Sequence, residues 1–234
     1  MDTKRDTQSL SELQEEILGC RRCPRLIDHC RSVAALRRKA YREWEYWGRP
    51  VAAFGDPGAQ LLIIGLAPAA HGANRTGRMF TGDRSGDLLY RVLYDTGFAS
   101  QPVSRSRNDG LELRGAYVTA AARCAPPGNK LTGEEMRNCR PYLARELALL
   151  KGIKVVVALG RIAFDAYLSI LRDEGIIPSR AAFRFGHDRE HPIGAGRPLL
   201  ISSYHPSQQN TSTGRLTEAM LRRVFQRARR HLGR

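Results

Sequence analysis

Four short apolar runs constrain the fold of this chain more than any other feature of its sequence. The first, residues 60–65, reads Gln-Leu-Leu-Ile-Ile-Gly and is continuous rather than alternating, as in a strand buried on both faces. Similar runs lie at residues 116–123, 154–159 and 199–204, and helical patterns lie between them at residues 85–96, 132–150 and 161–172. Strands that alternate with helices predict an α/β fold with a mainly parallel sheet covered on both faces.

In sheets of this kind, ligands bind beyond the carboxyl ends of the strands, where the loops gather. The loops that follow residues 65, 123 and 204 are therefore the expected place for chemistry. The first of them, residues 65–83, contains four glycines and little apolar bulk, so its backbone can approach a ligand closely. The other two loops carry polar side chains beside prolines, immediately after the strand ends.

The length is compatible with one domain over residues 1–234, in which residues 1–8 are expected to be flexible. The polar, partly acidic N-terminus resembles neither a secretory signal nor a transit peptide, and no apolar run approaches the roughly 18 residues of a membrane span. A cytoplasmic protein without a membrane partner is expected. Residues 217–234 read as a basic C-terminal helix, whose charged face is either solvated or lines DNA.

Two segments near the N-terminus have helical patterns. Ser9 and Glu12 form a capping box, which predicts a helix over residues 10–18 that ends at Gly19. Further along, residues 31–50 are basic and aromatic, and Trp44 and Trp47 are spaced as a helical pair would be. This spacing favours an ordinary amphipathic packing segment.

The charge of the chain favours a polyanionic partner. Lys and Arg number 38 against 23 Asp and Glu, giving a formal charge of +15. The excess is mostly Arg, whose planar fork matches phosphate oxygens, and nucleic acid is the commonest polyanion in the cytosol. Arg-rich codon usage would produce the same excess, so charge does not decide between the two explanations.

Five cysteines in a cytosolic chain argue against a disulfide framework and leave metal binding or burial. Cys20 and Cys23 form a CxxC pair, Cys124 and Cys139 form a second and wider pair, and Cys30 is the spare. A zinc site would usually show two tight pairs, whereas a wide second spacing suits a cluster held by loops and a helix. The residues alone leave an iron-sulfur cluster, zinc and inert buried thiols as alternatives.

Several motifs, in order, resemble the uracil-DNA glycosylase superfamily, and within its iron-sulfur subgroup the branch numbered family 5. They are Gly65-Leu-Ala-Pro-Ala, Gly77-Arg-Met-Phe-Thr-Gly-Asp83, Cys124-Ala-Pro-Pro-Gly-Asn129 and His205-Pro-Ser, with four cysteines in the same order relative to them. The resemblance covers residues 12–225 and implies a three-layer α/β/α fold with a central four-stranded sheet. It also implies a 4Fe-4S cluster on Cys20, Cys23, Cys124 and Cys139, acting as a structural clamp.

The resemblance implies a monofunctional DNA repair enzyme that hydrolyses the N-glycosidic bond of uracil and leaves an abasic site. Such an enzyme flips the nucleotide into a pocket, stacks the base and reads its edge. Phe80 is the expected stacking platform, and the amide of Asn129 is expected to complement the uracil edge. His205 is expected to donate to the O2 atom of the departing base. The ordinary alternatives are a core Phe, a turn Asn and a loop His.

Asp83 is the candidate for stabilising the sugar cation and orienting the attacking water, although it would equally cap the helix that follows. Relatives place a polar side chain inside the first motif, which is wholly apolar here, so His71 or Asn74 are the other candidates for the water. Relatives also carry an Asn where this chain has Thr119-Ala-Ala-Ala122. A pocket lined by Ala67, Ala69 and Ala120 would have room for hypoxanthine and other deaminated bases.

The loop after His205 is expected to enter the minor groove of DNA and to fill the vacated stack. Its residues are Ser207, Gln208, Gln209 and Asn210, which are polar rather than wedge-shaped; an exposed polar turn is the alternative. The competing function is an iron-sulfur DNA-binding protein without catalysis. A nuclease is disfavoured because the chain shows no carboxylate cluster suited to two metal ions. A Schiff-base lysine is not evident either, and a monomer is expected.

Overall fold

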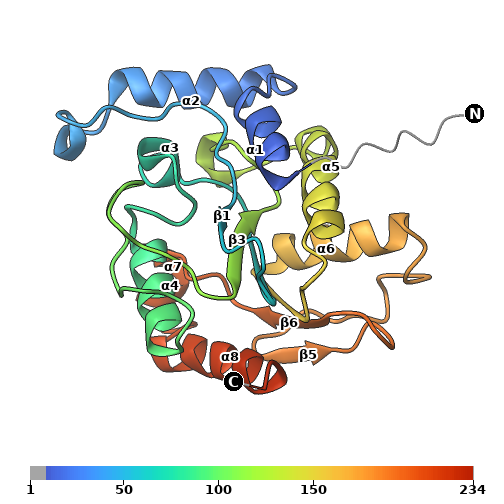
Figure 1. Ribbon diagram of the computed structural model, residues 1–234. Coiled ribbons are helices and arrows are strands. Elements are labelled where there is room, and N and C mark those ends of the chain that lie inside the picture. Colours follow the sequence, from blue (N-terminus) through green and yellow to red (C-terminus); the bar gives the residue numbers. More distant parts are fainter. Residues whose placement is uncertain (1–8, 234) are drawn as a thin grey trace, which may run out of the picture.

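The computed structural model describes residues 9–233, so the expected flexibility of residues 1–8 lies outside the described part (Figure 1). Four parallel strands form the centre of the sheet: β2 (Leu61–Gly65), β3 (Ala116–Ala120), β4 (Val155–Leu159) and β6 (Leu199–Ser203). Every residue of β2, β3 and β4 is buried. The prediction of buried parallel strands from the four apolar runs is confirmed.

The sheet has six strands rather than the four expected, in the order β1-β3-β2-β4-β6-β5. The additional strands, β1 (Phe54–Gly55) and β5 (Arg189–His191), are antiparallel to their neighbours and lie at the two edges. They are two and three residues long and are only partly buried, so neither carries an apolar run that a sequence pattern would reveal.

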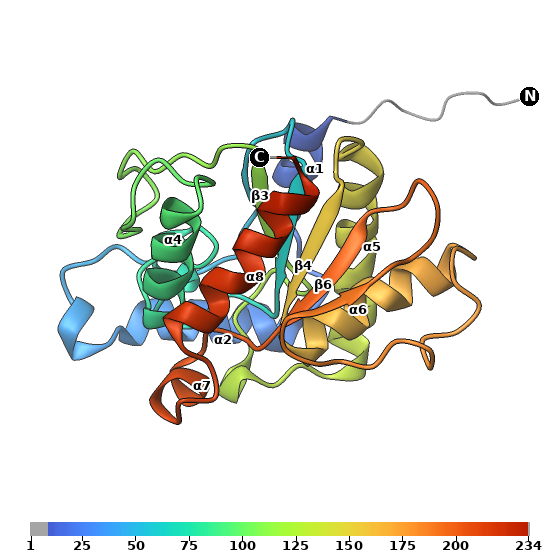
Figure 2. The ribbon, with the colours of Figure 1, turned by 90° about the horizontal axis from the view of Figure 1, so that it is seen from below.

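Helices cover both faces of the sheet, as expected for three layers. The helices are α1 (Leu10–Leu18), α2 (Pro24–Leu36), α3 (Ala73–Thr76), α4 (Arg84–Asp95), α5 (Gly133–Leu149), α6 (Arg161–Asp173), α7 (Gln208–Ser212) and α8 (Glu218–His231), with 3-10 turns η1 (Lys39–Tyr41) and η2 (Pro127–Asn129). Helices α4 and α8 lie on one side of the strands and α5 and α6 on the other (Figure 2).

Alternating side chains of the strands supply two separate cores. Leu61 and Ile63 of β2 pack with apolar residues of α4 and α8, whereas Leu62 and Ile64 pack with those of α5 and α6. This division follows from the two-residue period of a strand, which sends successive side chains to opposite faces. A continuous apolar run is therefore what a sheet covered on both faces requires.

Local signals define most helix ends. The expected capping box forms at the start of α1, where Ser9 and Glu12 bond reciprocally to the backbone, and Gly19 ends this helix. Thr132 and Glu135 make the same arrangement at the start of α5. In contrast, the expected helical pair of Trp44 and Trp47 is wrong, because η1 is the only helical segment between Leu36 and Phe54 and it ends at Tyr41.

The C-terminal helix α8 buries an apolar stripe against the sheet, while its arginines bond to neighbouring segments. Arg222 pairs with Asp95, Arg227 pairs with Asp188 and Glu190, and Arg229 donates to the carbonyl of Thr96. These three side chains therefore fasten α8 to the domain. None of the helices within residues 9–233 is long and apolar enough to cross a membrane.

Candidate active site

His205 follows the last residues of β6 at the carboxyl edge of the sheet, where the sequence places it. It lines a cavity of about 290 Å³ together with residues from β4, α6 and the loops around β6. The other lining residues are Leu66, Leu159, Gly160, Arg161, Ile162, Phe185, Tyr204, Asn210 and Arg215. Burial lowers the pKa of His205 to about 4, because a charged imidazolium would lose its hydration there. Its ring is therefore neutral at physiological pH.

Two neighbours hold the backbone of His205 in place. Asn210 donates from its side-chain amide to the carbonyl oxygen of His205 over 2.8 Å. Gly160 has a φ of +94°, and a Cβ atom added there would lie 3.2 Å from the Cβ of His205. A side chain at Gly160 would thus meet both backbone strain and crowding against His205.

Phe80 lies beside His205, with ring centroids 5.8 Å apart and ring planes inclined by 28°. Its edge faces the backbone of Gly65, where an added Cβ atom would come within 2.6 Å of the ring. The backbone of Phe80 has a φ of +52°, which is uncommon for a bulky residue. The structure thus brings two predicted site residues, Phe80 and His205, into contact.

A buried ion pair supports the strained backbone at Phe80. Arg78 pairs with Asp109 at 2.8 Å and donates to Thr81 and Ser104. Burial opposes the charge on Asp109, but the hydrogen bonds from Arg78 and from backbone amides prevail and lower its pKa to about 2. The loop that carries Phe80 is therefore anchored on both sides of that residue.

Asp83 caps α4, so the helix-cap alternative is present in the structure. Its Oδ1 atom accepts a hydrogen bond from the amide of Gly86 over 2.9 Å. Its Oδ2 atom lies against the backbone of Gly72, where an added Cβ atom would be 2.0 Å from it. Burial raises the pKa of this carboxyl group, against the opposing effect of the Gly86 and Ser85 amides and of Arg75. Asp83 is not among the residues that line the cavity beside His205.

The two other candidates for handling water have partners of their own. The Nδ1 atom of His71 lies 3.1 Å from the hydroxyl of Tyr46. The amide of Asn74 donates to the carbonyl of Cys30 over 3.2 Å, and its Oδ1 atom is buried without a partner within residues 9–233. Asn74 therefore links the loop to the segment that carries the N-terminal cysteines.

Several predicted contact residues lie outside the cavity. Ala67 is partly buried after β2, and Asn129 is exposed in the left-handed region at φ +58°. Ser207 precedes α7, on which Gln208 and Gln209 are exposed. Of the four predicted DNA contacts, Asn210 alone lines the cavity, and its amide is engaged with His205. The other predicted contact residues named here do not line it.

Residues that follow β4 also line the cavity, although only the ends of the other three strands were expected to do so. Gly160 and Arg161 follow β4 directly, and both line the cavity. Tyr204 ends the apolar run at residues 199–204, so it lies where a site was expected. Phe185 and Arg215 carry no such local signal. The guanidinium of Arg215 lies 4.6 Å from the ring centre of Tyr204, which brings a cation to the cavity.

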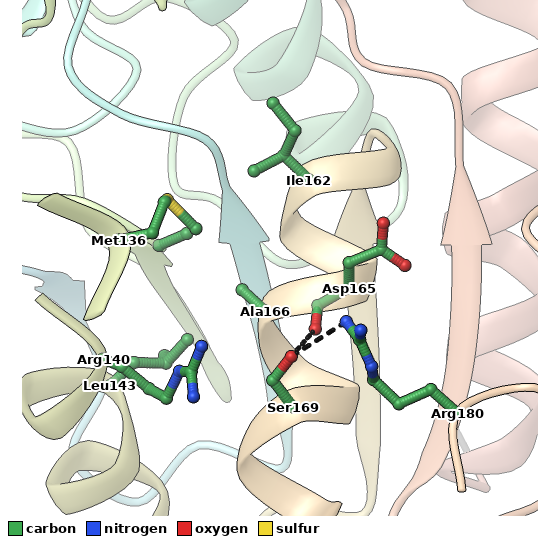
Figure 3. Close-up of a pocket in the computed structure, with 9 residues that line it drawn as sticks. Met136, Arg140, Leu143, Ile162, Asp165, Ala166, Ser169 and Arg180 are labelled. Carbon is green, nitrogen blue, oxygen red and sulfur yellow. Dashed lines mark hydrogen bonds between the residues drawn. The ribbon is translucent and has the colours of Figure 1, made fainter. Parts of the chain in front are cut away.

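A second hollow lies between α5 and α6 (Figure 3) and shares only Ile162 with the cavity beside His205. Its polar groups already have partners: Arg180 donates to Ser169 over 3.1 Å, and Ser169 donates to the carbonyl of Asp165 over 2.7 Å. Arg140 pairs with Asp173 at 2.6 Å. Because these groups satisfy one another, the cavity beside His205 is the better candidate for a polar ligand.

The four paired cysteines gather on one side of the sheet. Cys20 follows α1, Cys23 precedes α2, Cys124 follows β3, and Cys139 lies in α5. Cys23 and Cys124 pack in one buried cluster, which brings the two pairs together. Burial, together with the thiols of Cys23 and Cys20, raises the pKa of Cys139. Within residues 9–233, however, no three His, Cys, Asp or Glu side chains form a group suited to a metal ion.

The spare thiol, Cys30, is also buried in this region. Its Sγ atom donates to the carbonyl of Ala125 over 3.7 Å. The amide of Asn138 donates to the Sγ atom of Cys23 over 3.5 Å, which links the N-terminal pair to α5. The region therefore contains all five cysteines of the chain, and four of them belong to the two pairs defined by sequence spacing.

The fold and the site define an α/β protein that presents a neutral imidazole to a cavity at the carboxyl edge of its sheet. The family model described as the uracil DNA glycosylase superfamily matches residues 52–229. The chain belongs to this superfamily, as its motifs indicate.

Within this superfamily, the chain is more similar to type-5 than to type-4 uracil-DNA glycosylases. A type-5 uracil-DNA glycosylase of Mycobacterium leprae is 47% identical over 226 residues, which cover 96% of each chain. A type-5 enzyme of Thermus thermophilus is 49% identical over 219 residues, covering 94% of this chain and 96% of the relative. A type-4 uracil-DNA glycosylase of Archaeoglobus fulgidus is 26% identical over 201 residues, covering 86% and 82%. The predicted resemblance to family 5 is confirmed.

Proposed function

We propose that this protein is a monofunctional uracil-DNA glycosylase, which hydrolyses the N-glycosidic bond of uracil in DNA and leaves an abasic site. The observation that carries the proposal is the neutral His205 at the cavity of a chain that is 47% identical to a type-5 uracil-DNA glycosylase. Lyase action is not expected, because none of the lysines within residues 9–233 lines this cavity. DNA is the polyanion that the charge of +15 would attract.

His205 acts on the departing base. Dissociative cleavage leaves negative charge on the pyrimidine, chiefly at O2, and positive charge on the sugar. A neutral imidazole N–H directed at O2 stabilises the anion by a hydrogen bond and keeps its own proton. A preorganised donor of this kind contributes about 3 to 4 kcal/mol. The Asn210 bond and the close approach of Gly160 keep the histidine backbone in position. Phe80, beside His205, supplies an aromatic face for a flipped base.

Asp83 acts on the sugar side in this proposal. Its Oδ1 atom is committed to the cap of α4, which leaves Oδ2 to carry the interaction with water or the oxocarbenium ion. The cap and the catalytic role are therefore compatible, since each oxygen serves one of them. In this proposal Asn129 contacts the base edge, and the polar residues Ser207, Gln208 and Gln209 contact the DNA. All four are exposed or partly exposed.

The same site is proposed to accept hypoxanthine and other deaminated bases. The support is the small side chains of Ala67, Ala69 and Ala120, which offer neither bulk nor hydrogen-bond donors for selecting one base. We expect alkali-labile breaks at uracil and at hypoxanthine in labelled oligonucleotides, with mispaired bases cleaved fastest because they unstack most easily. Breaks at uracil and none at hypoxanthine in any pairing would contradict the broad specificity.

The competing function, DNA binding without catalysis, is supported by the wholly apolar motif Gly65-Leu-Ala-Pro-Ala69. The alkali assay decides between the two. If the wild-type protein binds the oligonucleotides and leaves every lane unbroken, including those with mispaired uracil, the glycosylase proposal is wrong and the binding function stands.

We also propose that Cys20, Cys23, Cys124 and Cys139 hold a 4Fe-4S cluster. The donor set fits such a cluster, because Cys23 and Cys124 pack together and Asn138, the neighbour of Cys139, donates to the Sγ atom of Cys23. Four thiolates are the usual ligands of a 4Fe-4S cluster. When bound, the cluster supplies a structural clamp between α1, α2, β3 and α5. The chain's own residues carry the chemistry of cleavage, and no step requires electron transfer.

Replacing Cys124 with Ala is expected to abolish bound iron and the brown absorbance and to lower thermal stability at the same time, because a ligand of the clamp is lost. Cys30→Ala is the matched control, since this buried thiol lies next to the site but belongs to neither pair. Iron content, visible absorbance and melting temperature are measured together. Unchanged stability in an iron-free Cys124→Ala protein would disprove the clamp, and iron loss in Cys30→Ala would reassign the ligands.

A further inference from the structure

Arg75 of α3 bridges two backbone segments that enclose the carboxylate of Asp83. Its Nε atom donates to the carbonyl of His71 over 2.8 Å, and its Nη2 atom donates to the carbonyl of Gly82 over 2.7 Å. The carbonyl of His71 immediately precedes Gly72, whose backbone faces the Oδ2 atom of Asp83. The carbonyl of Gly82 immediately precedes Asp83 itself. One guanidinium group thus sets the separation between the two walls around this carboxylate.

The guanidinium is itself held between two aromatic rings. Its central carbon lies 4.0 Å from the ring centre of Tyr41 and 4.1 Å from that of Trp44. Both residues belong to the segment after α2, which turns back toward α3 (Figure 1). These aromatic residues of the stretch 31–50 therefore contact a buried cation and do not pack as one face of a helix. Two aromatic faces can retain a cation that has lost most of its water.

The guanidinium group of Arg75 is buried and incompletely hydrogen-bonded. The residue is 4% exposed, and its Nη1 atom is buried without a hydrogen-bond partner within residues 9–233. An incompletely bonded buried cation is costly, and such groups concentrate at functional sites. Burial raises the pKa of the Asp83 carboxyl group, and the positive charge of Arg75 is among the influences that oppose this rise.

We infer that Arg75 is a positioning residue for Asp83: the guanidinium, packed against Tyr41 and Trp44, holds the two backbone segments that place the carboxylate. The inference rests on the proposed glycosylase function and on the role of Asp83 in it. The charged and titratable groups around this pair are Asp87 on α4, His71 in the loop, and Tyr41 and Tyr46 in the segment after α2.

The test is the pH dependence of single-turnover uracil excision by the iron-loaded protein. Arg75→Gln removes the charge, so the pKa of Asp83 rises further and the acidic limb of the rate profile moves to higher pH. We expect the rate at neutral pH to fall by about tenfold to a hundredfold, as for a misplaced catalytic group. Arg75→Lys retains the charge and should keep the limb in place while losing rate. Arg42→Gln, which removes an exposed charge beside Tyr41, is the matched control.

Trp44→Leu weakens the clamp without removing the charge and is expected to lower the rate without moving the limb. If Arg75→Gln fails to fold, Trp44→Leu and Arg75→Lys together test the positioning role of Arg75. Wild-type rates in these two variants would overturn the inference. A wild-type pH profile and rate in folded Arg75→Gln would overturn it as well. If Asp83→Asn cleaves uracil as fast as wild type, the proposed role of Asp83 fails instead, and with it the basis of the inference.

Discussion

Replacing His205 with Ala is expected to lower the single-turnover rate of uracil excision by about 100- to 1,000-fold, while the protein stays folded and still binds DNA. The loss corresponds to one preorganised donor at a developing anion. His205 lies just after β6 with its ring beside Phe80, and within residues 9–233 its side chain makes no hydrogen bond to a strand. Truncation should therefore remove the donor without disturbing the strands. The measurement is the rate of alkali-labile site formation under enzyme excess.

The matched control is His231→Ala, near the end of α8, where the imidazole pairs with Glu190 at the surface. This variant should cleave at the wild-type rate. Equal rates for His205→Ala and wild type would contradict the role of His205 in the proposed mechanism. The variants are compared at equal iron content, so that loss of the proposed cluster is not mistaken for loss of the donor.

The pH profile provides an independent check on the state of His205. Its pKa is lowered to about 4, so the ring is already neutral at pH 5 and remains neutral as the pH rises. The rate should show no inflection near the ordinary histidine value of 6.5. The acidic limb should instead follow Asp83, whose raised pKa means that its charge, and with it the rate, is lost as the pH falls. A limb near pH 6.5 that vanishes in His205→Ala would contradict a neutral donor.

Replacing Arg123 with Met is expected to destabilise the protein by about 3 to 5 kcal/mol, the usual cost of leaving one buried charge without its partner. Arg123 and Glu146 are each 1% exposed and form an ion pair at 2.6 Å. Thr119 accepts from Arg123 over 2.5 Å and donates to the same carboxylate oxygen over 2.7 Å. The loss of Arg123 therefore leaves a buried carboxylate with one hydroxyl donor. Urea unfolding of the iron-loaded protein measures the effect.

The double variant Arg123→Met and Glu146→Leu should recover much of this loss, because it removes both charges rather than one. Arg172→Met, which breaks an ion pair with Asp173 at the surface, is the matched control and should change the unfolding midpoint far less. A double variant as unstable as Arg123→Met alone would show that packing, and not the unpaired charge, sets the cost.

This ion pair also gives a physical reason for the position of the cysteine region. Arg123 directly precedes Cys124, and Glu146 lies two turns of α5 beyond Cys139. The pair thus joins the end of β3 to α5 beneath the two cysteines, and Thr119 is drawn into the same network. Thr119 is thus part of the buried core.

The four central strands and the long helices could be predicted because their signals are local. A continuous apolar run needs only its own residues to indicate a strand buried on both faces, and the box at Ser9 and Glu12 needs only one turn of helix. The edge strands β1 and β5 could not be predicted in this way. They are too short to have a pattern and exist because a neighbouring strand offers unpaired backbone groups.

The candidate site divides in the same manner. The sequence by itself determined which loops meet at the carboxyl edge and that His205, Phe80 and Asp83 lie on them, since parallel strands place their ends together. Only the tertiary structure decided that Phe80 contacts His205, that Asn210 supports the histidine backbone, and that Arg75 lies between Tyr41 and Trp44. Those contacts join segments far apart in the chain, and their geometry follows from packing, which no local pattern records.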